Sequence, residues 1–199
     1  MPEEIVSPFP PLKSHPASEM RSTLLTTSIQ SLRAHGHLEQ YTKTVSKEYR
    51  DAILTTVAGI WLPLAIGIAH YTACDRLNLP PSEQFAIGKE VGDRVQGTIL
   101  GLLVRTAKQA GLTPWTGLSS GNRMYERLFV GGGVCLTKLG PKEARLEVVN
   151  NQLFGLAYFR NGFRGIVATG AELFCEKAYV HELPKLTSAT SLGMRVSWA

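Results

Sequence analysis

Hydrophobic positions recur every three to four residues through roughly the first two-thirds of the chain, the spacing of one side of a helix. A first helix is expected to begin at Ser18, a good N-cap residue, and to end at Gly36. A short polar helix or loop follows over 38–46. A further helix is expected to open at Pro80, with proline and acid in its first turn, and to end at Gly111. The N-terminal part is therefore predicted to be helical.

One segment within this part, Ala52 to Ala73, contains no Asp, Glu, Lys or Arg, and His70 is its single histidine. The segment is long enough to cross a bilayer. Threonines, glycines and Pro63 dilute its hydrophobicity, and no second segment of this kind exists. A helix from Lys47 to Leu77, buried on most sides in a bundle, is the favoured interpretation, with membrane insertion as the alternative.

Further along the chain the hydrophobic period shortens to two, which is typical of strands with one buried face. Helices thus come first and strands later, which predicts the α+β class. We expect an N-terminal helical bundle packed on a four-stranded antiparallel sheet. The expected order is hairpin, helix, hairpin: strands at 134–139 and 144–150, a helix at 158–176, and strands at 177–186 and 190–198.

Residues 1–17 are rich in proline and are expected to form an extended arm. Phe9 and Leu12 are the side chains that would fasten the arm to the body. A proline-motif ligand for another protein is the alternative interpretation. Residues 18–199 are then expected to form one α+β domain.

The charge and cysteine content restrict the function classes. The chain has 21 Lys+Arg against 16 Asp+Glu, a net charge of +5, with no dense basic run, which argues against nucleic-acid binding. The three cysteines are odd in number and widely spaced, which indicates a reducing compartment. The first residues lack the basic flank and apolar stretch of a signal peptide, so we expect a cytoplasmic protein.

Glycines recur four residues apart on the helix that opens at Pro80: Gly88 and Gly92, then Gly97 and Gly101. Each glycine costs a helix about 1 kcal/mol relative to alanine, so four of them indicate that something approaches this face closely. A neighbouring helix, a ligand cavity or a dimer partner would each explain them.

No hydrolase, P-loop, dinucleotide-binding or metalloprotease motif is present, so we expect neither an enzyme nor a metal site, and the sequence identifies no cofactor. His35 and His37 are interpreted as exposed histidines at a helix end. His70 and Cys74 share a helix face, and a hydrogen-bonded core histidine beside a buried cysteine is favoured over a pair of metal ligands.

A thiol–imidazole pair of His181 with Cys135 or Cys175 is the one catalytic alternative, although nothing in the sequence brings these residues together. An anion site is a separate hypothesis. Arg160 and Arg164 lie one turn apart on the last expected helix, where they would hold an anionic group or an acidic partner, or simply form a solvated face.

Short segments carry a resemblance to a known family. They are Gly121-Asn122-Arg123-Met124-Tyr125-Glu126, Lys138-Leu139-Gly140-Pro141, Leu146-Glu147-Val148-Val149-Asn150, Tyr158-Phe159-Arg160-Asn161-Gly162, Gly170-Ala171 and Met194-Arg195-Val196-Ser197-Trp198. From about Tyr49 onward the chain resembles a myxobacterial paralogous family of uncharacterised single-domain proteins. That family has no established activity, so the resemblance implies no functional residue.

The layout is also similar to the superfamily of ligand-binding domains in nitric-oxide signalling and Golgi transport, which includes haem-nitric-oxide-binding, 4-vinyl-reductase-type and Bet3-type domains. This resemblance implies a pocket between helices and sheet, and often a dimer made through helices. The Tyr-x-Ser-x-Arg signature of the haem sensors and the cysteine cluster of many 4-vinyl-reductase-type domains are absent from the sequence. The resemblance therefore implies neither haem nor metal here.

The leading hypothesis is a non-enzymatic sensory or regulatory module that holds a small apolar ligand between its helices and its sheet. A protein–protein adaptor, acting as a homodimer or docking a partner, is the alternative. The expected ligand-binding residues are Trp61, Ile66, His70, Val95, Ile99 and Phe163.

Overall fold

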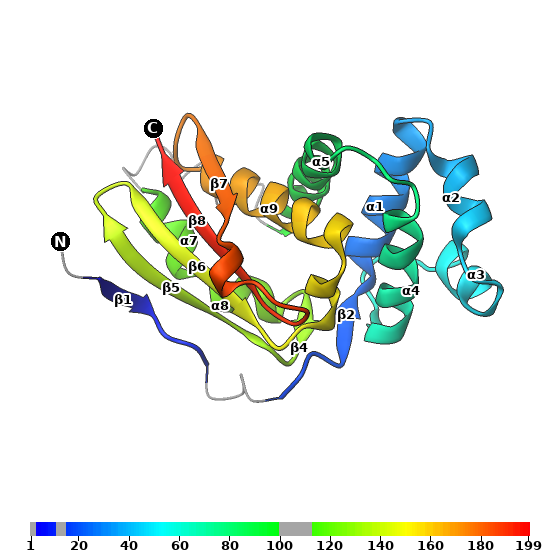
Figure 1. The fold of residues 1–199 in the computed structure, drawn as a ribbon, viewed down its shortest axis with the longest axis horizontal. Helices are drawn as coiled ribbons and strands as arrows, with labels where there is room; N and C mark the ends of the chain where they lie inside the picture. Colours follow the sequence, from blue (N-terminus) through cyan, green and yellow to red (C-terminus); the bar gives the residue numbers. More distant parts are fainter. Residues whose placement is uncertain (1–2, 11–14, 100–112) are drawn as a thin grey trace.

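The computed structural model describes residues 3–10, 15–99 and 113–199, without the side chains of 96–99. Leu12, Gly101 and Gly111, to which the sequence analysis gave roles, lie outside the described residues. Helices gather at one end of the molecule and a sheet forms the other, with two long helices between them (Figure 1). The α+β class is confirmed.

The helical end follows the expected order with shifted bounds. The first helix begins at Ser22 rather than Ser18, because the preceding residues Glu19–Arg21 form a strand, β2. Gly36 takes a left-handed φ of +78° directly after this helix, the conformation for which glycine is favoured. The helices here are α1 (Ser22–Ala34), α2 (Leu38–Thr44), α3 (Lys47–Leu54), α4 (Leu64–Asp75) and α5 (Pro81–Ile99).

The single long helix expected from Lys47 to Leu77 is wrong. The chain forms α3, a loop, the short strand β3 (Trp61–Pro63) and then α4. Gly59 in the loop has a φ of +90°, which no helix accommodates, and Pro63 lies directly before α4, where its missing N–H costs nothing. No helix in the described part of the chain is both long and apolar enough to span a membrane.

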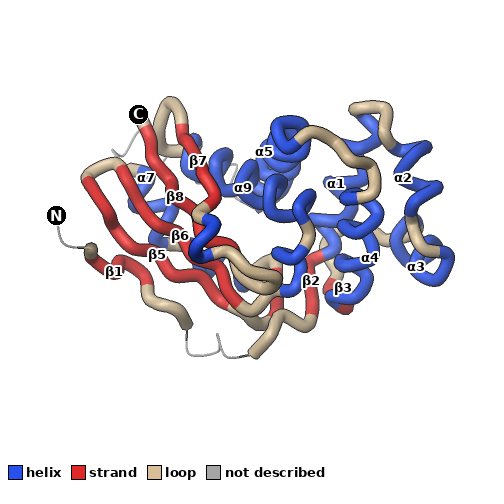
Figure 2. Tube along the Cα trace, in the orientation of Figure 1, coloured by secondary structure: helices blue, strands red, loops and turns tan. Residues whose placement is uncertain are grey.

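The main sheet holds five antiparallel strands in the order β1-β5-β6-β8-β7, of which four are the expected ones. Alternation in β6 is regular: Ala144, Leu146 and Val148 are buried while their neighbours are half-buried. Figure 2 shows the five strands of this sheet running side by side, with α9 (Ala157–Glu172) next to β7. Their bounds are β1 (Glu4–Ser7), β5 (Gly133–Gly140), β6 (Glu143–Val149), β7 (Ala178–Glu182) and β8 (Leu192–Trp198).

The fifth strand comes from the N-terminal arm. Strand β1 pairs antiparallel with the edge of β5. A Glu3 carboxylate oxygen lies 3.0 Å from an Arg145 guanidinium nitrogen, and Asn122 Nδ2 donates to the Pro8 carbonyl oxygen at 3.0 Å. The arm therefore docks as part of the sheet.

A smaller sheet and two short helices complete the architecture. Strands β3, β2 and β4 (Phe129–Val130) form a three-stranded sheet with β2 in the centre. The two short helices are α7 (Pro114–Ser119) and α8 (Gly121–Glu126). The 3₁₀ turn η2 (Gln152–Gly155) precedes the last helix, and the 3₁₀ turn η3 (Pro184–Leu186) follows β7.

The last helix, α9 (Ala157–Glu172), packs against α5 through glycines. A methyl group built on Gly88 would lie 2.0 Å from the Gly162 carbonyl oxygen, and one on Gly165 would lie 2.3 Å from the Phe85 carbonyl oxygen. A neighbouring helix thus explains Gly88 and Gly92, both of which face α9. At Gly88 and Gly92 the face is therefore occupied by α9 of the same chain.

Candidate functional site

A chain of buried polar side chains links α1, α2 and α4. Tyr41 Oη lies 2.5 Å from His70 Nδ1, and Ser28 Oγ lies 3.0 Å from His70 Nε2, so both ring nitrogens of this fully buried histidine are hydrogen-bonded. Burial lowers the pKa of His70 to about 3, because the interior disfavours the charged ring. His70 is therefore the neutral, hydrogen-bonded core histidine that the sequence favoured.

A small pocket of about 20 Å³ lies where α1, α4, α5 and α9 meet; we call it the helix pocket. This volume is room for about one water molecule. Its walls are almost entirely apolar and include the backbone contact between α5 and α9. The lining residues are Ser28, Tyr71, Ile87, Gly88, Val91, Tyr158, Phe159, Gly162, Phe163 and Ile166.

Tyr158 lines this pocket and carries a buried hydroxyl. The side chain is only 2% exposed, and its oxygen lies close to Ser28 and Cys74 without a hydrogen bond of acceptable geometry in the described structure. Burial raises the pKa of Tyr158, so the group is an uncharged phenol. Buried hydroxyls normally have a hydrogen-bond partner, so the unsatisfied geometry of this one is a feature of note.

The expected ligand-binding residues are only partly brought together. Phe163 lines the helix pocket, and His70 stands behind it in edge contact with Tyr71, with ring centres 4.6 Å apart. Val95 is buried on α5, beyond the lining residues. Trp61 lies on β3, and the Arg21 guanidinium carbon is 4.0 Å from the centre of the Trp61 ring.

The described part of the structure does not place the two remaining expected residues, Ile66 and Ile99, in the helix pocket. Ile66 is a half-buried residue of α4 that packs at the margin of the core. Ile99 falls within the bounds of α5, but its side chain is outside the described residues. The sequence did not single out Tyr158 for this site, although it stands first in the Tyr-Phe-Arg-Asn-Gly segment that carried the family resemblance.

The thiol–imidazole contact forms at a different place from the one considered. Cys74 Sγ lies 3.7 Å from His70 Nε2 in the core, whereas His181 is an exposed residue of β7. Burial raises the pKa of both Cys74 and Cys135, which opposes the thiolate that a nucleophile requires.

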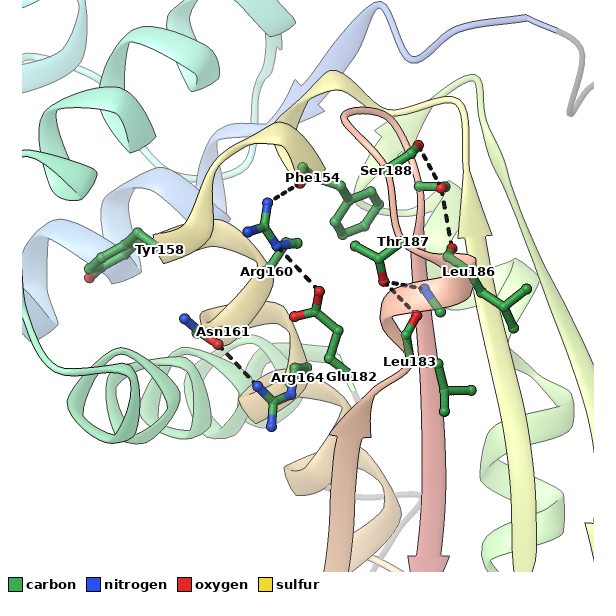
Figure 3. Close-up of polar contacts among 12 residues, drawn as sticks. Phe154, Tyr158, Arg160, Asn161, Arg164, Glu182, Leu183, Leu186, Thr187 and Ser188 are labelled. Atoms are coloured by element: carbon green, nitrogen blue, oxygen red, sulfur yellow. Dashed lines mark hydrogen bonds and ion pairs between the residues drawn. The ribbon is translucent and has the colours of Figure 1, made fainter.

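A second concavity, which we call the surface groove, lies between the start of α9 and the loop after β7 (Figure 3). Its volume is about 400 Å³. Arg160 projects from α9 and Glu182 from the end of β7, with Arg160 Nε 3.7 Å from Glu182 Oε1. In Figure 3 Tyr158 points away from Arg160, so the groove and the helix pocket are separate.

The two arginines of the predicted anion site have different roles. Arg164 donates to the Val180 carbonyl oxygen through Nη2 at 3.0 Å and Nε at 3.3 Å, and its Nη1 donates to Asn161 Oδ1 at 3.0 Å. The two bonds to Val180 hold α9 against β7. Arg160 alone of the pair lines the surface groove, and its counterpart Glu182 was not predicted because the two come together only through packing of α9 on β7.

Comparison with known proteins shows the fold. No protein-family model and no curated protein matches the sequence. Among solved structures, an Fe(II) unliganded H-NOX protein from K. algicida aligns with a TM-score of 0.65 at 11% identity, over 90% of this chain and 97% of its own. An oxygen-binding H-NOX domain related to soluble guanylate cyclases, solved as its oxygen complex, aligns with a TM-score of 0.56 at 13% identity, over 90% of this chain and 95% of its own. The resemblance in layout to haem-nitric-oxide-binding domains is confirmed.

The described interior does not fit a haem. The helix pocket is far smaller than a porphyrin, and α5 and α9 are in backbone contact beside it. Both ring nitrogens of His70 are already bonded, and the other histidines lie away from the core: His15 and His181 are exposed, His35 pairs with Glu90 and His37 pairs with Glu83. No group of three metal-binding side chains occurs among the residues that the structure describes.

Proposed function

We propose that this protein is a non-enzymatic sensory or regulatory module that takes a small uncharged ligand into the helix pocket without haem. The single observation on which this proposal stands is that the buried Tyr158 hydroxyl makes no hydrogen bond of acceptable geometry in the described structure. A ligand that accepts or donates one hydrogen bond would satisfy this group, and a filled pocket would be worth more to the folded state than an empty one.

The walls of the pocket define the ligand class. Phe159, Phe163 and Val91 offer apolar surface, and a charged ligand there would lose its hydration without gaining an ionic partner. The ligand is therefore neutral, with one polar end toward Tyr158 and an apolar remainder.

The α5–α9 contact sets the size limit. Gly88 and Gly162 touch through their backbones at the edge of the pocket, so a ligand of more than about two non-hydrogen atoms enters only if these helices separate. If α9 moved away from α5 on ligand binding, it would also shift against the strands that it contacts. A regulatory module could signal that its pocket is occupied through such a movement.

Titration of ¹⁵N-labelled protein with methanol, ethanol and propan-1-ol tests the proposal by NMR. We expect saturable shifts at the Gly88 and Gly162 amides that weaken as the alcohol lengthens, and that are lost in Tyr158→Phe. Native mass spectrometry of freshly purified protein checks for a retained molecule. Shifts that never saturate, or that are equal in the wild type and Tyr158→Phe, would contradict the proposal.

A further inference from the structure

The surface groove is a polar site with one cation and one anion facing each other. The Arg160 guanidinium points from the first turns of α9 toward the Glu182 carboxylate at the end of β7 (Figure 3). Both side chains are about one-quarter exposed. The opposite wall is the loop after η3, where Thr187 and Ser188 lie. This arrangement is independent of the helix pocket.

Arg160 is held in place by backbone rather than by its acidic neighbour. Its Nη1 donates to the Phe154 carbonyl oxygen at 2.7 Å, which fixes the plane of the guanidinium. Its Nε is buried and makes no hydrogen bond among the described residues, because Glu182 stands off at 3.7 Å. A guanidinium oriented in this way, and only loosely paired with Glu182, can engage a further acceptor through its remaining donors.

The loop wall is polar and internally hydrogen-bonded. Thr187 Oγ1 donates to the Leu183 carbonyl oxygen at 3.1 Å and accepts from the Gly193 amide at 3.3 Å. Ser188 Oγ lies 2.8 Å from Ser191 Oγ. At the floor, a methyl group built on Gly155 would lie 3.1 Å from the Ala189 carbonyl oxygen, so the loop approaches the start of α9 closely.

The charges restrict what the surface groove accepts. A simple anion drawn to Arg160 would meet the Glu182 carboxylate, and a simple cation drawn to Glu182 would meet Arg160. A ligand that carries a carboxylate and an ammonium group close together replaces the long ion pair with two short, charge-assisted contacts. A volume of about 400 Å³ accommodates a molecule of that kind together with its side chain.

We infer that the surface groove binds a free α-amino acid, with its carboxylate on Arg160 and its ammonium group on Glu182. The hydroxyl-lined loop and Ala189 then face the amino-acid side chain. The site supplies recognition only, and no bond is made or broken.

Isothermal titration calorimetry of the full chain with the twenty proteinogenic amino acids tests this inference. We expect one or more of them to bind with one-to-one stoichiometry. For each that binds, the N-acetyl derivative removes the ammonium charge and the carboxamide removes the carboxylate, and both are expected to lose binding. Retained binding of the carboxamide would show that the groove takes a cation, and retained binding of the N-acetyl form would show that it takes an anion; either result overturns the zwitterion assignment.

Three variants locate the site. Arg160→Gln and Glu182→Gln each remove one charge and are expected to weaken binding about tenfold or more. Lys185→Gln removes a charge from the exposed neighbouring turn and is expected to leave binding unchanged. Circular dichroism confirms that each variant is folded; because Arg160 also bonds Phe154, Glu182→Gln decides the matter if Arg160→Gln is unstable.

Binding that survives both groove variants places the amino acid elsewhere and overturns the inference, as does the absence of binding by all twenty amino acids at millimolar concentration. Neither result affects the helix pocket, which Tyr158→Phe tests separately.

Discussion

Two helix interfaces meet at the helix pocket, and they differ in what fills the space between the helices. Between α5 and α9 the backbones touch at Gly88 and Gly162, with no side chain between them. Between α1 and α4 the gap is bridged by hydrogen-bonded side chains, Ser28 to His70 and on to Tyr41. A methyl group added at Gly88 would clash with α9, and a proton added to the His70 ring would place a charge in the core. The same core is therefore held by close backbone packing at one interface and by side-chain hydrogen bonds at the other.

The largest effect is expected from adding a single methyl group to the α5–α9 contact. Gly88→Ala places a carbon about 2.0 Å from the Gly162 carbonyl oxygen, so the helices must move apart, at a cost of about 3 kcal/mol in the free energy of unfolding. Urea unfolding measures this loss. Gly121→Ala is the matched control, because its nearest neighbour would be Val134 Cγ1 at 3.5 Å, and it is expected to change stability by about 0.5 kcal/mol or less. Equal effects of the two substitutions would show that α5 and α9 are not in close contact.

The hydrogen-bonded interface is expected to fail with falling pH. The pKa of His70 is about 3 in the folded chain and near 6.5 in the unfolded chain, so between these values the unfolded state binds the additional proton. Stability due to His70 is therefore complete above about pH 6.5 and declines as the pH falls toward 3. From pH 7.5 to pH 5 the loss is about 2 kcal/mol.

Comparison with His70→Gln isolates this contribution in urea unfolding at the two pH values. Glutamine retains hydrogen-bonding capacity without titrating. The surface pairs of His35 with Glu90 and His37 with Glu83 are the same in both proteins, so they cancel in the comparison. The wild type is expected to lose about 2 kcal/mol more than the variant, and parallel losses would exclude a buried neutral His70.

The smallest effect is expected at the junction of the two interfaces. Tyr158→Phe removes a hydroxyl that makes no hydrogen bond of acceptable geometry in the described structure, so in ligand-free protein the free energy of unfolding is expected to be unchanged or to rise by about 1 kcal/mol. Tyr125→Phe is the matched control, because the Tyr125 hydroxyl accepts a hydrogen bond from Asn151 Nδ2 at 3.0 Å, and its loss is expected to cost about 1–2 kcal/mol. Thermal unfolding of the two variants side by side distinguishes them. A Tyr158→Phe loss as large as that of Tyr125→Phe would mean that the first hydroxyl is already engaged.

Sequence periodicity predicted the strands of the C-terminal half, most clearly β6, where buried residues alternate with half-buried ones. Leu146 and Val148 alternate with Glu147 and Val149, and the structure places Leu146 and Val148 in the core. The glycines of α5 were equally informative, since Gly88 serves the close approach that its cost implied. Both signals are local in sequence.

The errors arose where the local signal was absent. From Ala52 to Ala73 nearly every position is apolar or small, so no period separates a helix from a loop or a short strand. The pairing of β1 with β5 depends on an edge more than a hundred residues away along the chain. Arg160 faces Glu182 only once α9 has packed on β7. The Tyr158 hydroxyl likewise becomes buried only when α9 has packed.

The pairing of β1 with β5 has a consequence for the handling of this protein. Residues 4–7 cover main-chain amides and carbonyls of β5 that would otherwise stand open along the rim of the sheet. Uncovered rims of this kind recruit strands from other molecules and seed aggregation. A polypeptide trimmed to begin at Ala17 would lose that protection, so proteolysis within the first sixteen residues is a route to insoluble protein even though every core residue is retained.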